Sequence, residues 1–249
     1  MIMRIVALAA GIIIALGSMG VSAQASGQML PEFKAEYDVY RSGVKIARLE
    51  RSFTRQADGN LLYRSETNVT GLASMFRNDR IIEESRWQYT KGKVVPLFYQ
   101  YLHTGTSRDR NVTVEFDWKS GLVTNSVNGS PWRMTASEGI LDKLLYQYSI
   151  MLDMQAGKSS LRYTVADGGT EKIYVFKKLG EETLETALGN LNTIKMERHR
   201  ADSDRNSVFW SAPDVGYLPV KLENIDDGVK TVVVIRSVTG LGTKTVTQK

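Results

Sequence analysis

One stretch of the sequence decides the fold that we expect, Ser207–Glu223, which reads SVFWSAPDVGYLPVKLE. An apolar run ends at Trp210, and a second strand-like run begins at Tyr217. Between them, Pro213 has a fixed φ and no N–H, and Gly216 tolerates a positive φ, so the chain is expected to turn here. The stretch predicts two strands joined by a tight turn, with Trp210 largely buried.

The same alternation of apolar and polar residues runs through most of the chain. It is clearest at Val112, Val114, Phe116 and Trp118, as in a strand with one buried face. We count about twelve strands joined mainly by short turns, which favours an antiparallel meander. They are expected near residues 33–39, a run ending at 53, 61–69, 81–89, 97–102, 112–118, 161–165, 173–176, 191–198, 208–210, 220–225 and 229–238.

Two segments break this pattern. Residues 141–155 place Leu144, Leu145 and Tyr148 on one face at helical spacing, which predicts an amphipathic helix. The residues expected on its opposite, polar face are Asp142, Lys143, Gln147 and Asp153. Such a helix must bury its apolar stripe, and the available surface is the concave side of the sheet. Residues 71–78 (GLASMFRN) are expected to form one or two helical turns.

These patterns predict the fold class and the domain organisation. We expect a mainly β protein, in which a single curled antiparallel meander sheet, barrel-like but unclosed, carries one amphipathic helix on its concave face. Residues 24–240 are expected to form this one domain. Residues 241–249 are polar and are expected to form a flexible C-terminal tail.

The N-terminus has the features of a cleaved export signal. Arg4 gives a short positive region, residues 5–16 are apolar, and small residues follow as far as Ala23 and Ala25. We expect residues 1–23 to be a signal peptide, although cleavage after Ala25 also fits. An uncleaved anchor is the alternative, but the apolar run is short for a membrane span. The expected location of the mature chain is the periplasm.

Composition excludes several function classes. The chain has no cysteine, which excludes cysteine nucleophiles, zinc–cysteine sites and iron–sulfur clusters. The net charge of +5 is spread among acidic neighbours, whereas a nucleic-acid binder concentrates its basic residues. We therefore expect no nucleic-acid partner and only peripheral attraction to anionic membrane surfaces.

No catalytic or metal-binding constellation is visible in the sequence. The two histidines, His103 and His199, fall on different expected strands, and there is no G-x-S-x-G motif. Glu83, Glu84 and Arg86 are expected to lie on a charged outer face rather than to point inward. We therefore predict no metal, no cofactor and no enzymatic activity, with an unrecognised carboxylate site left open as an alternative.

Aromatic side chains are the one feature that suggests a binding site. They gather on the expected strands and helix, where an apolar cavity between curled sheet and helix would bind a hydrophobic ligand. Ordinary core packing is the alternative explanation. The candidate cavity-lining residues are Tyr99, Tyr101, Phe116, Trp118, Leu145, Tyr148 and Trp210.

Several motifs resemble an uncharacterised family of exported bacterial proteins, the Domain of Unknown Function 3108 family. These motifs are GLASMF at 71–76, IIEESRW at 81–87, LDMQAG at 152–157, LGNLNTIK at 188–195 and the Trp-x-x-Pro…Leu-Pro segment that begins at Trp210. They are strand and turn motifs, so the resemblance implies a fold and no chemistry. A looser resemblance, to the periplasmic lipoprotein-carrier fold, implies a curled, unclosed sheet that holds a lipid beneath helices.

Three functional hypotheses follow. The first is a non-enzymatic envelope protein that binds a hydrophobic ligand or an envelope partner in a cavity between sheet and helix. The second is a structural or assembly factor with no small ligand, and the third is an enzyme with an unrecognised carboxylate site. The sequence leaves the ligand, the partner and the oligomeric state open.

Overall fold

Fourteen strands and one α-helix make up the described part of the chain in this computed structural model, which covers residues 29–71, 79–106, 109–158, 160–199, 206–226 and 228–242. The first eight strands are β1 (Phe33–Arg41), β2 (Val44–Arg55), β3 (Leu61–Val69), β4 (Arg80–Thr90), β5 (Lys93–Thr104), β6 (Arg110–Asp117), β7 (Leu122–Val127) and β8 (Ser130–Thr135). After the helix α1 (Leu145–Gln155) come β9 (Leu161–Asp167), β10 (Thr170–Thr186), β11 (Gly189–His199), β12 (Asn206–Ala212), the 3-10 turn η2 (Pro213–Val215), β13 (Leu218–Asp226) and β14 (Val229–Thr239).

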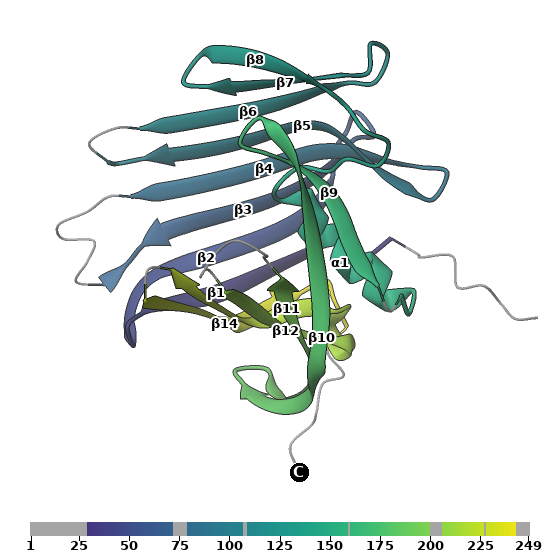
Figure 1. Cartoon of the computed structure of the whole chain (residues 1–249). Coiled ribbons are helices and arrows are strands. Elements are labelled where there is room, and N and C mark those ends of the chain that lie inside the picture. Colours follow the sequence, from purple (N-terminus) through teal and green to yellow (C-terminus); the bar gives the residue numbers. More distant parts are fainter. Residues whose placement is uncertain are drawn as a thin grey trace, which may run out of the picture.

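All fourteen strands belong to one antiparallel sheet, in which nearly every strand pairs with its neighbours in the sequence. The order runs from β8 down to β1, then from β14 down to β9. The strands of largest sequence separation, β1 and β14, are therefore adjacent, with Tyr37 opposite Ile235. In Figure 1, β1–β8 form a ladder, and β9 and β10 cross in front of it. The sheet curls without closing, because β8 and β9 remain its two edges.

The helix α1 fills the middle of the concave face. The Tyr148 ring lies 4.9 Å from the ring centres of both Phe53 and Trp87 and 5.6 Å from that of Tyr63. Just before the helix, Leu141 forms a parallel bridge with Val165 of β9. These contacts confirm the predicted fold class, a mainly β meander with one helix packed on its concave face.

Alternation along the strands explains why the core lies on this face. In β1, Phe33, Ala35, Tyr37 and Val39 are all less than a tenth exposed, whereas the residues between them are not buried. Side chains of a strand point to opposite faces in turn, so one face of β1 supplies the core and the other meets solvent. Burying each large apolar side chain contributes about 1.5–3 kcal/mol.

The stretch from Ser207 to Glu223 has the predicted form of β12, η2 and β13. Gly216 has φ +66°, as expected for the turn, and a Cβ there would lie 2.9 Å from Cδ2 of Leu30. Trp210 is buried at 4% exposure, and its indole N–H donates to Oε1 of Glu182. The prediction of a buried, partnered tryptophan is therefore confirmed.

Three details differ from the sequence-based prediction. The helix begins at Leu145 rather than Leu141, because Leu141 pairs with β9 and Asp142 folds back to accept the N–H groups of the first turn. Asp142 is consequently buried at 0% exposure, not on a polar outer face. Fourteen strands are present rather than twelve, because the count omitted β7 and β8, which have few alternating apolar residues.

Other expectations fall on residues outside the described part. These are the signal peptide at 1–23, most of the predicted helical turns at 71–78 and most of the predicted tail at 241–249. Leu241, the first residue of that tail, is buried at 6% exposure and belongs to the core.

Candidate ligand groove beside the helix

A cavity of about 660 Å³ lies along one side of α1. We call it the helix groove. Its walls are formed by Tyr89, Val94, Val95, Trp118, Leu141, Ser149, Leu152, Ala156 and Tyr163, and its rim carries Lys93, Glu138, Asp153 and Lys158. Pockets that bind small molecules in proteins occupy about 300–1,000 Å³ and have mostly apolar walls. The helix groove matches both properties.

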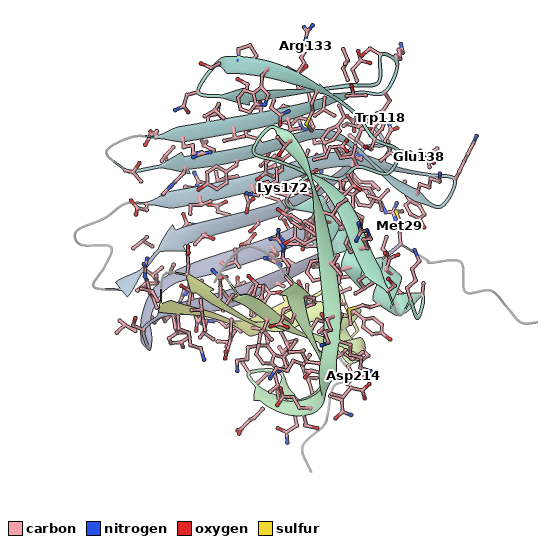
Figure 2. The ribbon with its side chains drawn as sticks, in the orientation of Figure 1. Met29, Trp118, Arg133, Glu138, Lys172 and Asp214 are labelled. Carbon is pink, nitrogen blue, oxygen red and sulfur yellow. The ribbon has the colours of Figure 1, made fainter. Side chains whose placement is uncertain are left out.

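Trp118 forms the outer wall of the helix groove. It follows β6, and its indole N–H donates to the carbonyl of Pro96 at 2.7 Å, which fixes the ring. The ring stacks on Phe116 with 6.0 Å between centres and an interplanar angle of 13°, yet Trp118 remains 38% exposed. Figure 2 shows Trp118 and Glu138 at the same end of the molecule. An exposed, fixed aromatic ring offers a contact surface that needs little ordering on binding.

Charged pairs surround the apolar walls. Lys93 and Glu138 form an ion pair of 2.7 Å at the rim, and Lys158 and Asp153 form another of 2.6 Å. The Tyr163 hydroxyl, from the wall of the groove, donates to the same Asp153 at 2.8 Å. Burial, together with the Asp153 charge, raises the pKa of Tyr163, so its hydroxyl stays protonated. The groove combines an apolar floor with a polar rim.

Ser149 lines this groove and carries a buried hydroxyl without a partner in the described part of the chain. It lies on α1, is 6% exposed, and its Oγ has no hydrogen-bond partner among the described residues. Buried hydroxyls in folded proteins nearly always have a partner, and leaving one without costs about 1–3 kcal/mol. Oγ is enclosed by neighbouring protein atoms, so a polar group of a ligand would reach it only after the Ser149 side chain changes rotamer.

A buried polar row runs along the concave face behind α1. Asp142 accepts the Ser85 hydroxyl at 2.5 Å and the N–H groups of Leu144 and Leu145 at 2.9 and 2.7 Å. Burial raises the pKa of Asp142 to about 6, although these hydrogen bonds oppose the rise. The groups act together as the N-terminal cap of α1, since Leu144 itself makes no capping bond through its side chain.

Glu83 belongs to the same row, which corrects the expectation that it lies on the outer face. Its carboxylate accepts the Tyr99 hydroxyl at 2.6 Å on the concave side. The neighbouring Glu84 does face outward, where it pairs with Arg64 at 2.7 Å, and Arg86 is exposed. Alternation along β4 explains the difference, because residues 83 and 85 point inward and residues 84 and 86 outward.

The seven residues predicted to line one cavity do not meet in one cavity. Trp118 lines the helix groove, with Phe116 behind it. Leu145 and Tyr148 are fully buried in the core. Trp210 points to the convex side of the sheet, between Lys195 and Lys221 at 5.0 and 4.4 Å from its ring. Sequence reasoning missed several groove residues because they gather from separate elements: Val94, Val95, Leu141, Ser149, Leu152, Ala156 and Tyr163.

Tyr99 and Tyr101 line a second cavity of about 310 Å³, which we call the corner cavity. Its other lining residues include Arg110, Asn125, Trp132, Lys143, Asp167 and Gly169. A Cβ at Gly169 would overlap the indole of Trp132, so the turn after β9 packs directly against the edge strand β8.

Asp167 sits on one wall of the corner cavity between two lysines. Lys143 and Lys172 lie 3.2 and 3.0 Å from its carboxylate, and the Tyr174 hydroxyl donates to it at 2.9 Å. Burial alone raises the pKa of Asp167, but these partners outweigh it and lower the pKa to about 2. The carboxylate is already satisfied, which makes it a structural anchor of the β9–β10 turn.

The described residues contain neither a group of metal ligands nor a helix that could cross a membrane. No cluster of three or more histidine, aspartate or glutamate side chains in them could hold a metal ion. None of their helices has the length and apolar character needed to cross a membrane.

Known proteins resemble the chain mainly in fold. No curated protein matches it. A crystal structure of a beta-barrel-like protein of the domain of unknown function DUF1849 from Brucella abortus is 7% identical, with a TM-score of 0.53, and the match covers 84% of this chain and 97% of that one. A candidate lipoprotein from Parabacteroides distasonis is also 7% identical over 85% of this chain and 96% of its own, but its TM-score of 0.33 is too low to establish a common fold.

The family is established by sequence. The model described as "Protein of unknown function (DUF3108)" matches residues 36–236, which is most of the chain and includes the motifs quoted above. The chain therefore belongs to the DUF3108 family, as its strand and turn motifs predicted.

Proposed function

We propose that this chain is an exported, non-enzymatic protein of the bacterial cell envelope that binds a hydrophobic ligand in the helix groove. The observation that carries the proposal is the groove itself, about 660 Å³ with mostly apolar walls and an unpaired hydroxyl at Ser149. A lipid acyl chain or similar apolar molecule fits this groove because its walls are mostly apolar, and the Ser149 hydroxyl can meet one polar group once its side chain turns toward the ligand. The N-terminal features of an export signal support a periplasmic location.

The ligand is tested with delipidated protein and a fluorescent fatty-acyl probe. Ala156 lies at the end of α1 with φ −77° and lines the groove, so Ala156→Trp should fill the groove without straining the backbone. We expect the wild type to bind the probe with micromolar affinity and Ala156→Trp to weaken binding by about tenfold or more, which is about 1.4 kcal/mol.

The matched control is Gln155→Trp, one residue earlier on the helix. Gln155 is exposed and does not line the groove, so this variant adds the same indole outside it. Equal binding by the wild type and both variants would place the ligand elsewhere. Complete absence of probe binding, together with no lipid in mass spectra of protein purified from the native envelope, would refute the proposal.

An assembly role without a small ligand is the second candidate, and the edge strand β8 favours it. Five of its six residues are exposed, and its outer side has no partner strand in the described sheet. Such an edge can pair with an extended segment of another protein. Under this alternative, the wild-type protein does not bind the fluorescent probe. Replacing Arg133 in β8 by proline should then abolish activity in a complementation assay.

A further inference from the structure

A third cavity, of about 160 Å³, lies against other residues of α1 than the helix groove does, and two arginines line it. We call it the arginine pocket. Arg51 of β2 and Arg198 of β11 line it, and apolar walls come from Ile150 of α1, Phe176 of β10 and Phe209 of β12. The cavity therefore draws its lining from both halves of the sheet and from the helix.

Arg51 is the unusual member of this pocket. It is 7% exposed, yet Nε and Nη1 have no hydrogen-bond partner, and no ion pair of its guanidinium is present among the described residues. Its close neighbours are tyrosines, Tyr63 and Tyr37, and the Tyr37 ring centre is 5.9 Å from Cζ. Glu83 lies two strands away across Ser65, with a Cα separation of roughly 10 Å, and its charge is among those that raise the pKa of Arg51 against the effect of burial. Burying guanidinium N–H groups without hydrogen-bond partners is costly, so the unpaired Nε and Nη1 of Arg51 indicate an anion that binds there.

Arg198 adds a second positive charge to the pocket. Its guanidinium stacks on Tyr174 with Cζ 3.2 Å from the ring centre, which holds the side chain in place. Its Nε is buried and has no hydrogen-bond partner among the described residues. Because the face of the guanidinium lies on the ring, its N–H donors point along the edge of the plane, the direction in which guanidinium groups bind oxyanions.

The acidic residue of the pocket does not neutralise these arginines. Glu223 also lines the cavity, but its carboxylate pairs with Lys221 and Lys230, each at 2.9 Å. The local balance therefore stays positive. Two guanidiniums beside aromatic and aliphatic walls match an oxyanion attached to an apolar group.

We propose that the arginine pocket binds the carboxylate or phosphate of a small amphiphilic ligand, with Arg51 and Arg198 on the oxyanion and Ile150, Phe176 and Phe209 on the apolar part. The site is separate from the helix groove and does not depend on the function proposed for it. Planar guanidinium groups donate two parallel hydrogen bonds to carboxylate or phosphate oxygens, which gives both affinity and orientation.

Calorimetric titration of the purified protein tests the site with four probes, hexanoate, hexyl phosphate, inorganic phosphate and neutral hexanol. We expect at least one of the two amphiphilic anions to bind, and their relative affinities to distinguish carboxylate from phosphate recognition. Hexanol and inorganic phosphate should each bind at least about tenfold more weakly than the better of the two amphiphilic anions. Hexanol lacks the oxyanion, and inorganic phosphate lacks the apolar chain. Absence of binding by both amphiphilic anions, or equal binding of hexanol, would overturn the proposal.

Three arginine-to-methionine variants separate the pocket from general charge effects. Arg51→Met and Arg198→Met should each weaken anion binding by about tenfold or more. Arg48→Met removes the same charge from an exposed position on the opposite face of β2 and should leave binding unchanged. Equal losses in all three variants would indicate a nonspecific charge effect and contradict the site.

The stability of the unliganded protein provides the second readout. Because the Arg51 charge has no anionic partner in the pocket, Arg51→Met should melt at the same temperature as the wild type or higher. A purely structural arginine would behave in the opposite way. A clear fall in melting temperature, or failure of this variant to fold, would show that Arg51 supports the fold through its contacts, and the proposal would then be wrong.

Discussion

Replacing Asp142 by asparagine should make the protein more stable at neutral pH and leave it unchanged in acid. Asp142 is fully buried, and it accepts hydrogen bonds from Ser85 and from the N–H groups of Leu144 and Leu145. An asparagine has the same shape, and its Oδ1 can still accept the two backbone N–H groups. Its Nδ2 can donate to the Ser85 hydroxyl oxygen, so the substitution keeps the cap and removes only the charge.

The magnitude follows from the pKa of Asp142. Burial raises it from the ordinary 3.8 to about 6, so the folded protein holds the proton more tightly than the unfolded chain does. Stability therefore falls as the pH rises from about 4 to about 6 and levels off above that. The difference between the two pKa values corresponds to about 3 kcal/mol, since each pKa unit is worth about 1.4 kcal/mol. The neutral asparagine side chain of the variant carries no such penalty.

Urea melts of the wild type and Asp142→Asn from pH 4 to pH 8 measure this difference. We expect equal unfolding free energies near pH 4 and an advantage approaching about 3 kcal/mol for the variant above pH 6. Asp142→Ala is the companion variant, which loses the cap and should be destabilised by about 1–3 kcal/mol at pH 4, where the wild-type carboxyl is neutral. A pH-independent difference between wild type and Asp142→Asn would refute the reasoning.

Three further substitutions test the fold. Gly240→Ala should be far more destabilising than Gly59→Ala. Both glycines have φ above +80°, but only a Cβ at Gly240 would overlap the Glu32 carbonyl, and overpacking of this kind adds about 1–3 kcal/mol. Similar melting temperatures of the two variants would contradict this prediction. Trp210→Ala should lower the free energy of unfolding by about 3–5 kcal/mol, and any loss of activity in a complementation assay should follow from that instability. A variant that melts like the wild type yet fails to complement would show that residues 207–223 form a binding site. Leu145→Ala should cost about 2–5 kcal/mol in a urea melt, and a change below about half a kcal/mol would mean that α1 is peripheral.

Much of the fold could be predicted from the sequence because its signals are local. Pro213 and Gly216 define the turn between β12 and β13, and alternation in β6 identifies its buried face. The helix boundary was less predictable. Leu141 continues the helical spacing, but its pairing with Val165 across the sequence overrides that local preference.

The candidate sites depend on residues that the sequence cannot bring together. Ser149, Val95 and Trp118 lie on three separate segments of the chain, and only the curl of the sheet places them around one groove. Arg51 resembles any charged residue in an alternating strand, because nothing nearby in the sequence marks its side chain as buried and unpaired. Aromatic content pointed to the space between sheet and helix, but most of those rings proved to be core.

The adjacency of β1 and β14 has a consequence for how the chain can fold and be re-engineered. Leu30 and Leu241 both lie beside Gly216, so the two ends of the described chain meet in space. A circular permutant joined there and opened between β8 and α1 would make every strand pair a sequence-neighbour pair, from β9 through β14 and β1 to β8. The native order instead closes one long loop to pair β1 with β14, and loop closure of that kind slows folding. We therefore expect each half-meander to form early and the seam between β1 and β14 to be the last part of the sheet to assemble.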